Sequence, residues 1–146
     1  MSDSVLASPD PVVRSAARWF WWIAGLSLVN TFLAHNGNHP QFVLGLGITA
    51  IADAMFSQAK AVAFLIDALA IGFFVLIGLQ ASRGKLRAFY LGLGVYALDA
   101  LVYVYLQNWM PVIFHGVVAF FIMKGVVRLR QAGSAAANPS AASSAE

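Results

Sequence analysis

Four long apolar runs constrain this chain more than any other feature. They occupy residues 19–34, 61–81, 88–106 and 111–127. Each is close to the roughly 17–25 residues that an α-helix needs to cross the hydrocarbon of a bilayer. Because lipid offers the backbone no hydrogen-bond partners, membrane segments of this length must be helices. The sequence therefore predicts an all-α integral membrane helical bundle with four transmembrane helices.

The composition supports a membrane protein over a soluble one. Only 10% of the 146 residues are charged and 60% are hydrophobic, whereas a soluble domain has about 25% charged residues. So few polar side chains would not cover the surface of a soluble fold. The basic residues flank the apolar runs, which is typical of orientation signals in a membrane and does not indicate nucleic-acid binding. The absence of cysteine excludes disulfides and thiolate metal sites.

The composition also divides the chain into three parts. Residues 1–16 are polar and contain proline, which predicts a flexible N-terminal tail. Residues 17–131 form the predicted transmembrane helical domain. Residues 132–146, "AGSAAANPSAASSAE", are rich in Ala and Ser, which predicts a disordered tail.

The segment 41–57, "QFVLGLGITAIADAMFS", leaves two topologies open. As a short re-entrant helix, with four spans and a cytoplasmic N-terminus, it puts eight of the nine basic residues inside. As a fifth spanning helix, with the N-terminus outside, it puts six inside. A weak repeat of 44–54 at 91–100 favours five spans, whereas the charge distribution favours four.

Small and polar residues recur at helical spacing in three segments, so that each helix has one line that should face protein or water instead of lipid. These lines are Ser27, Asn30, Thr31 and His35; Gln41, Gly45, Thr49, Asp53 and Ser57; and Gly92, Tyr96, Asp99, Tyr103 and Gln107. The sequences "GLGITA" and "GLGVYA" match a dinucleotide fingerprint but lack its strand–turn–helix context. We interpret Gly45, Gly47, Gly92 and Gly94 as residues that allow close helix packing.

Four ionisable residues within apolar segments form the candidate site. They are Asp53, Asp67, Asp99 and His115. A carboxylate at mid-membrane costs about 2.5–3.5 kcal/mol on insertion scales, so such residues need partners or a polar cavity. The helical rise places Asp67, Asp99 and His115 in the outer half of the bilayer. Asp53, one turn before Ser57, is at or near the outer side in both topologies, so the four residues can occupy one layer. Asp and His are acceptable ligands for Zn²⁺, Mn²⁺ or Fe²⁺, so the set is predicted to be a polar or metal site.

Three functions stay open for this layer. The first is a structural or accessory role, in which Asp99 accepts from a tyrosine hydroxyl and Asp67 from His115. The second is transport of protons, cations or small solutes. The third is a metal-dependent membrane hydrolase. No catalytic residue and no cofactor is assigned, and the stretch "HNGNHP" at 35–40 is interpreted as a loop because glycine and proline interrupt it.

Four stretches together resemble a type of small, uncharacterised bacterial polytopic membrane protein. They are "WIAGLSLVN" at 22–30, "FVLGLGIT" at 42–49, "YALDALVY" at 96–103 and "FHGVVAFFI" at 114–122. The resemblance implies a bacterial inner-membrane setting and no mechanism. The expected partners are the lipid bilayer and either a second copy of the chain or another membrane protein, because the predicted bundle is small.

Overall fold

The computed structural model describes residues 10–35, 46–56 and 58–137, and for Ala34, His35, Asp53 and Ala54 only the backbone. These parts of the chain form helices connected by turns and contain no strand, so the predicted all-α class is confirmed for them. The elements are α1 (Pro11–His35), α2 (Gly47–Met55), α3 (Lys60–Ser82), α4 (Leu86–Tyr105) and α5 (Trp109–Ala137).

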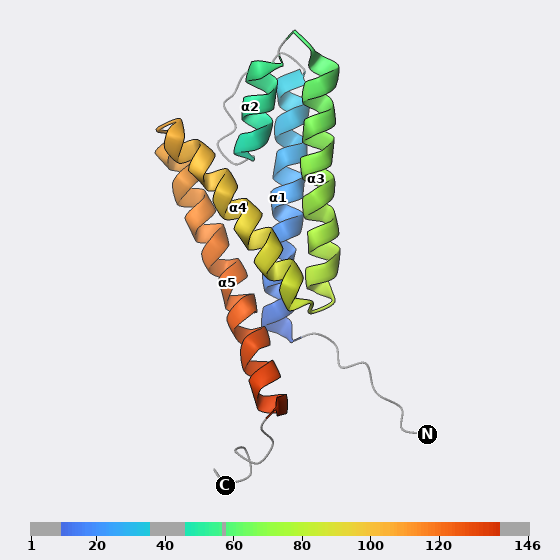
Figure 1. The fold of residues 1–146 in the computed structure, drawn as a ribbon, viewed down its shortest axis with the longest axis vertical. Coiled ribbons are helices and arrows are strands. Elements are labelled where there is room, and N and C mark those ends of the chain that lie inside the picture. The colour runs from blue at the N-terminus through green and yellow to red at the C-terminus, as the bar shows by residue number, and fades with distance from the viewer. Residues whose placement is uncertain (1–9, 36–45, 57, 138–146) are drawn as a thin grey trace, which may run out of the picture.

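The long helices pack as an antiparallel bundle (Figure 1). α1 packs against α3 and α5, α4 packs against α5 and α3, and the short α2 lies against α3 and α4. The start of α1, the α3–α4 turn and the end of α5 lie at one end, which we call the basic end. The end of α1 and the start of α3 lie together at the opposite end (Figure 1).

Three of the helices, α3, α4 and α5, are long and apolar enough to cross a membrane, by length and composition. They leave large apolar side chains such as Leu76, Leu98 and Ile113 exposed, as lipid-facing surfaces do. Three of the four predicted apolar segments are therefore confirmed as helices that could span a membrane, and the number of four spans stays a prediction. α1 has 25 residues but is less apolar, because Ser27, Asn30 and Thr31 lie in its second half.

The segment predicted as a re-entrant or fifth spanning helix contains α2. This helix has nine residues, which gives it a length of about 14 Å. The hydrocarbon core of a bilayer is about 30 Å thick, so α2 alone does not reach across it. Residues 41–45 and 57 of the segment lie outside the described residues, as do residues 36–40 of "HNGNHP".

Two helices extend beyond the predicted domain boundaries. α1 includes residues 11–16, which the sequence analysis assigned to the N-terminal tail, and α5 continues through 132–137 of the predicted C-terminal tail. At the start of α1, Asp10 accepts the backbone N–H of Val12 at 2.8 Å. An aspartate cap followed by proline at the first helical position favours a helix start here. Burial of Val13 and Ala16 then stabilises the first turns.

Glycines in three of the helices set how closely the helices approach one another. A Cβ atom on Gly92 of α4 would lie 2.5 Å from the Phe20 ring of α1, and one on Gly125 of α5 would lie 2.5 Å from the Ala16 Cβ. The predicted packing role is therefore confirmed for Gly92. It is also confirmed for Gly47, where a Cβ would meet Val102 at 3.0 Å. Gly94 faces open space, and Gly45 lies outside the described residues.

Candidate functional site

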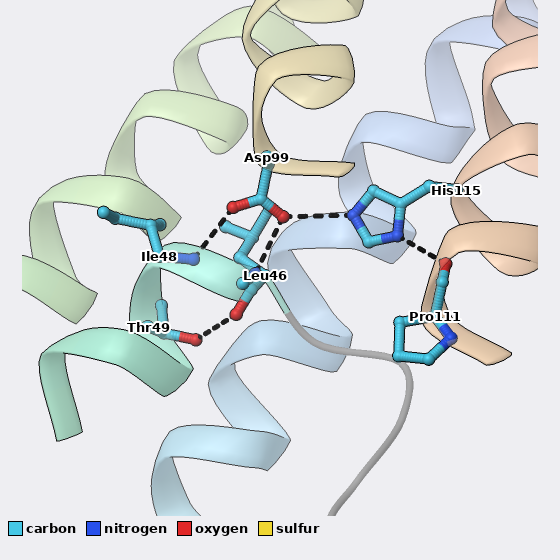
Figure 2. Close-up of polar contacts among 7 residues, drawn as sticks. Leu46, Ile48, Thr49, Asp99, Pro111 and His115 are labelled. Carbon is cyan, nitrogen blue, oxygen red and sulfur yellow. Dashed lines mark hydrogen bonds and ion pairs between the residues drawn. The ribbon is translucent and has the colours of Figure 1, made fainter. Parts of the chain in front are cut away.

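The carboxylate of Asp99 caps the start of α2 from another helix. Its Oδ2 accepts the backbone N–H of Gly47 at 2.7 Å, and its Oδ1 accepts that of Ile48 at 2.9 Å (Figure 2). The residue before α2, Leu46, has no side chain that can cap the helix. The start of a helix leaves N–H groups unpaired and carries a partial positive charge, so a carboxylate there accepts hydrogen bonds from the N–H groups and interacts favourably with the charge. Asp99 therefore supplies the cap that the local sequence lacks.

His115 of α5 is the third partner of this carboxylate. Its Nε2 lies 3.0 Å from Asp99 Oδ2, and its Nδ1 lies 2.8 Å from the backbone oxygen of Pro111. Figure 2 shows the imidazole between the two acceptors. Because α2, α4 and α5 each contribute to the cluster, it joins three helices. We call these residues, Gly47, Ile48, Asp99, Pro111 and His115, the capping cluster.

The acceptors in the capping cluster fix where its hydrogens lie. A backbone carbonyl oxygen only accepts, so Nδ1 of His115 must carry a hydrogen and donate it to Pro111. The contact between Nε2 and Oδ2 needs a second hydrogen, on the ring or on the carboxyl group. In either arrangement Asp99 and His115 together have no net charge. This neutrality lowers the free energy of burying the pair in a medium of low dielectric constant.

Two tyrosines of α4 enclose the imidazole. The Tyr96 ring stacks on it at a centroid distance of 4.2 Å and an interplanar angle of 16°, and the Tyr103 ring lies at 5.4 Å. Exposed fractions of 6% for Asp99 and 2% for His115 show that the cluster is closed to solvent. The predicted line of Gly92, Tyr96, Asp99 and Tyr103 is confirmed as the buried face of α4. Gln107 is exposed, in the turn after the helix.

Asp67 belongs to a second polar contact, between α1 and α3. It is fully buried, and its Oδ2 accepts a hydrogen bond from the Thr31 hydroxyl at 2.8 Å. The sequence predicted a hydrogen bond between His115 and Asp67, but His115 bonds Asp99 instead. The reason is that α5 packs beside α4, whereas Asp67 faces α1. In the sequence, Thr31 belongs to the polar line of its helix that is predicted to face protein or water, and this helical spacing is the signal that marks it as a possible partner of Asp67.

The structure thus brings together two of the four predicted site residues, Asp99 and His115. Asp67 lies at the α1–α3 contact, and the side chain of Asp53 is outside the described residues. Within residues 10–35, 46–56 and 58–137, no group of three or more His, Asp, Glu or Cys side chains is placed to hold a metal ion. Both nitrogens of His115 are engaged in hydrogen bonds. The metal interpretation of the four-residue set stays a prediction.

A surface ion pair lies at the basic end. Asp10 Oδ2 accepts a hydrogen bond from Arg128 Nε of α5 at 2.9 Å. The backbone N–H of Val12 first, and then Arg128, lower the pKa of the Asp10 carboxyl below its ordinary value of 3.8. The pair connects the start of α1 to α5.

In the described parts of the chain, the fold and the cluster together define an all-α protein with three helices that are long and apolar enough to cross a membrane and with a buried Asp–His pair. Comparison of the chain with protein-family models, with curated proteins and with solved structures gave no match.

Proposed function

We propose that this chain is a multi-pass protein of a bacterial inner membrane, in which α1, α3, α4 and α5 span the bilayer. A helix of 25 residues is about 38 Å long, so α1 exceeds the hydrocarbon thickness. It also lies alongside two helices that are apolar enough to span. Because α1 ends where α3 begins (Figure 1), we assign α2 to a re-entrant segment that returns to its own side.

The distribution of charge supports a cytoplasmic location for the basic end. Eight exposed basic residues belong to the first half of α1, to the α3–α4 turn with the first turn of α4, and to the second half of α5, the parts of these elements that lie toward the basic end. They are Arg14, Arg18, Arg83, Lys85, Arg87, Lys124, Arg128 and Arg130. Lys60 begins α3 at the opposite end. Basic residues concentrate on the cytoplasmic side of membrane proteins, so the capping cluster lies in the outer half of the bilayer.

Within this topology we infer a structural or accessory function, in which the capping cluster holds α2 inside the bundle. The observation that carries the proposal is the bonding of Asp99. One carboxylate accepts two backbone N–H groups of α2 and contacts His115 of α5. Without these acceptors, two polar backbone groups at the start of α2 would be left unpaired in a membrane, where each costs several kcal/mol.

Single cysteines in this cysteine-free chain test the topology. We expect Val12→Cys and Lys85→Cys to react with an impermeant maleimide only after the membrane is permeabilised. Gln58→Cys and Asn108→Cys should react from outside in intact cells. If residues 12 and 58 react from the same side, then α1 and α2 both cross and the re-entrant assignment is wrong.

A buried position in α2 tests whether the cluster holds this helix. Thr49 is fully buried, so Thr49→Cys should be protected from a water-soluble maleimide in purified protein. Combining it with Asp99→Ala, which removes both acceptors of the Gly47 and Ile48 N–H groups, should make residue 49 reactive. Gln58→Cys, which is exposed, provides the matched control. Equal protection of residue 49 with and without the Asp99 carboxylate would contradict the proposed function.

Transport of protons or cations is the second candidate, favoured by the hydrogen that His115 Nε2 and Asp99 Oδ2 must share. A buried pair that holds a transferable hydrogen is a recurring element of membrane relays. Vesicles containing the protein should then show proton or cation flux that Asp99→Asn abolishes. Transport would be ruled out if the unchanged protein shows no flux, or if the flux of the variant is intact, and the structural function would then be the remaining candidate.

A further inference from the structure

The basic end carries much more positive than negative charge. Eight basic side chains belong to it, and in the described parts of the chain Asp10 is the carboxylate found there. Asp10 is already bonded to Arg128 and to the backbone of Val12. The other basic side chains are exposed and are available for an external anion.

One of these cations is held in place by aromatic rings. Lys124 Nζ lies 5.0 Å from the centroid of the Phe120 ring and 5.6 Å from that of Phe121. Within residues 10–35, 46–56 and 58–137, no carboxylate lies within ion-pair distance of this ammonium group. Contact with the faces of two rings restrains a side chain that is otherwise flexible. The charge of Lys124 is therefore preorganised and lacks an anionic partner there.

The aromatic surface formed by these rings extends onto α1. The Trp19 indole stacks on Phe121 with a centroid distance of 5.1 Å and an angle of 16°. Phe120 and Phe121 are exposed and Trp19 is half-buried. The surface formed by Trp19, Phe120, Phe121 and Lys124 thus combines an apolar ledge across the α1–α5 contact with an ammonium group at its edge. We call it the α1–α5 ledge.

The residues of the α1–α5 ledge lie near the ends of the apolar runs of their helices, which places them at the boundary between hydrocarbon and headgroups. Trp19 begins the apolar run of α1, and Lys124 lies near the end of that of α5. Tryptophan and lysine favour this depth in membrane proteins. The phosphate of a phospholipid and the first carbons of its acyl chains lie at the same depth.

We propose that the α1–α5 ledge binds an anionic phospholipid of the cytoplasmic leaflet. The headgroup phosphate lies at Lys124, and the upper acyl carbons lie on Trp19 and Phe121. A soluble anion or a nucleic acid would use the charge but not the adjoining rings, whereas an anionic lipid uses both. The proposal rests on the membrane placement of α1 in the proposed function, which labelling of Val12→Cys tests separately.

Native mass spectrometry of the purified full chain tests the ledge. The probes are phosphatidylglycerol and phosphatidylcholine with the same acyl chains. We expect one phosphatidylglycerol to bind more tightly than phosphatidylcholine. Lys124→Gln should weaken it about fivefold, since a basic residue near an anionic membrane surface contributes about this factor. Lys124→Arg should keep most of the affinity, and Lys85→Gln, in the α3–α4 turn, is the matched control and should bind as the unchanged protein does.

Three outcomes would overturn the proposal. The first is equal binding of the two lipids. The second is an equal loss of affinity in Lys124→Gln and Lys85→Gln, which would indicate a diffuse positive field. The third is competition by glycerol phosphate at the concentration of the lipid, which would indicate a soluble anion. If Lys124→Gln fails to fold, the double change Phe120→Leu and Phe121→Leu keeps the charge, removes both rings and should weaken phosphatidylglycerol binding about threefold.

Discussion

Replacing Asp99 by asparagine is the most direct test of the capping cluster, because it keeps the shape of the side chain and changes its hydrogen bonding. The carboxylate accepts from Gly47 and Ile48 through separate oxygens. Asparagine has one oxygen and one NH₂ group, so in either orientation a donor faces one of these backbone N–H groups. At least one charge-assisted bond to α2 is lost, and one N–H is left buried without an acceptor.

The expected loss of stability is about 3 kcal/mol, since a hydrogen bond contributes roughly 0.5–1.5 kcal/mol, or up to about 3 kcal/mol at a charged group, and a buried N–H group left unpaired costs roughly 1–3 kcal/mol. For a chain of this size that loss corresponds to a midpoint lower by about 10 °C. The assay is thermal unfolding in detergent at a fixed scan rate. The control is Leu98→Ala, at the neighbouring exposed position, which should unfold near the unchanged protein. A midpoint for Asp99→Asn within about 2 °C of the unchanged protein would refute the assigned role of the carboxylate.

The contacts predict three further results, two from substitutions and one from a measurement on the unchanged protein. Gly92→Ala should destabilise the bundle by about 1–3 kcal/mol, because its Cβ would overlap the Phe20 ring, whereas Gly94→Ala, with open space around it, should leave the unfolding midpoint unchanged or raise it. Nitrogen-15 NMR should find a hydrogen on Nδ1 of His115, and a single ring hydrogen located on Nε2 would contradict the bond to Pro111. Because the pKa of Asp10 is lowered in the folded state, its ionised carboxylate should stabilise the fold fully above pH 3.8, and this stabilisation should be lost as the pH falls through the folded pKa. Asp10→Ala should remove this part of the pH dependence of thermal unfolding. The same fall of the unfolding midpoint at acid pH in Asp10→Ala and in the unchanged protein would contradict the prediction.

The helices and their inward faces could be predicted from the sequence because each depends on local spacing. The apolar runs predicted α3, α4 and α5, and the spacing of Tyr96, Asp99 and Tyr103 predicted the buried face of α4. α1 begins at Pro11, within the segment 1–16 that was predicted as a tail. Its first turns are stabilised by the Asp10 cap and by the packing of Ala16 against α5, and neither depends on the length of the apolar run.

The pairing of the buried ionisable residues depends on which helices are neighbours, and the spacing of residues within each helix carries no information on that. Asp67 and Asp99 were equivalent candidates for His115, since both lie at similar depth in apolar helices. α5 follows α4 through a short turn, so that His115 lies next to Asp99, and this proximity along the chain favours the observed pair over the expected one.

The capping of α2 was beyond prediction for a different reason. Its donors are backbone N–H groups of Gly47 and Ile48, which leave no mark in the sequence, and the acceptor lies about 50 residues further along the chain. The sequence did contain an indirect sign, since Leu46 before α2 has no capping side chain and Asp99 lies isolated in an apolar segment. A helix start without a cap and a membrane carboxylate without a neighbouring cation complement one another, because each supplies the group that the other lacks. When two such features occur in one membrane chain, their pairing is a reasonable first hypothesis for how a short helix is held within the bilayer.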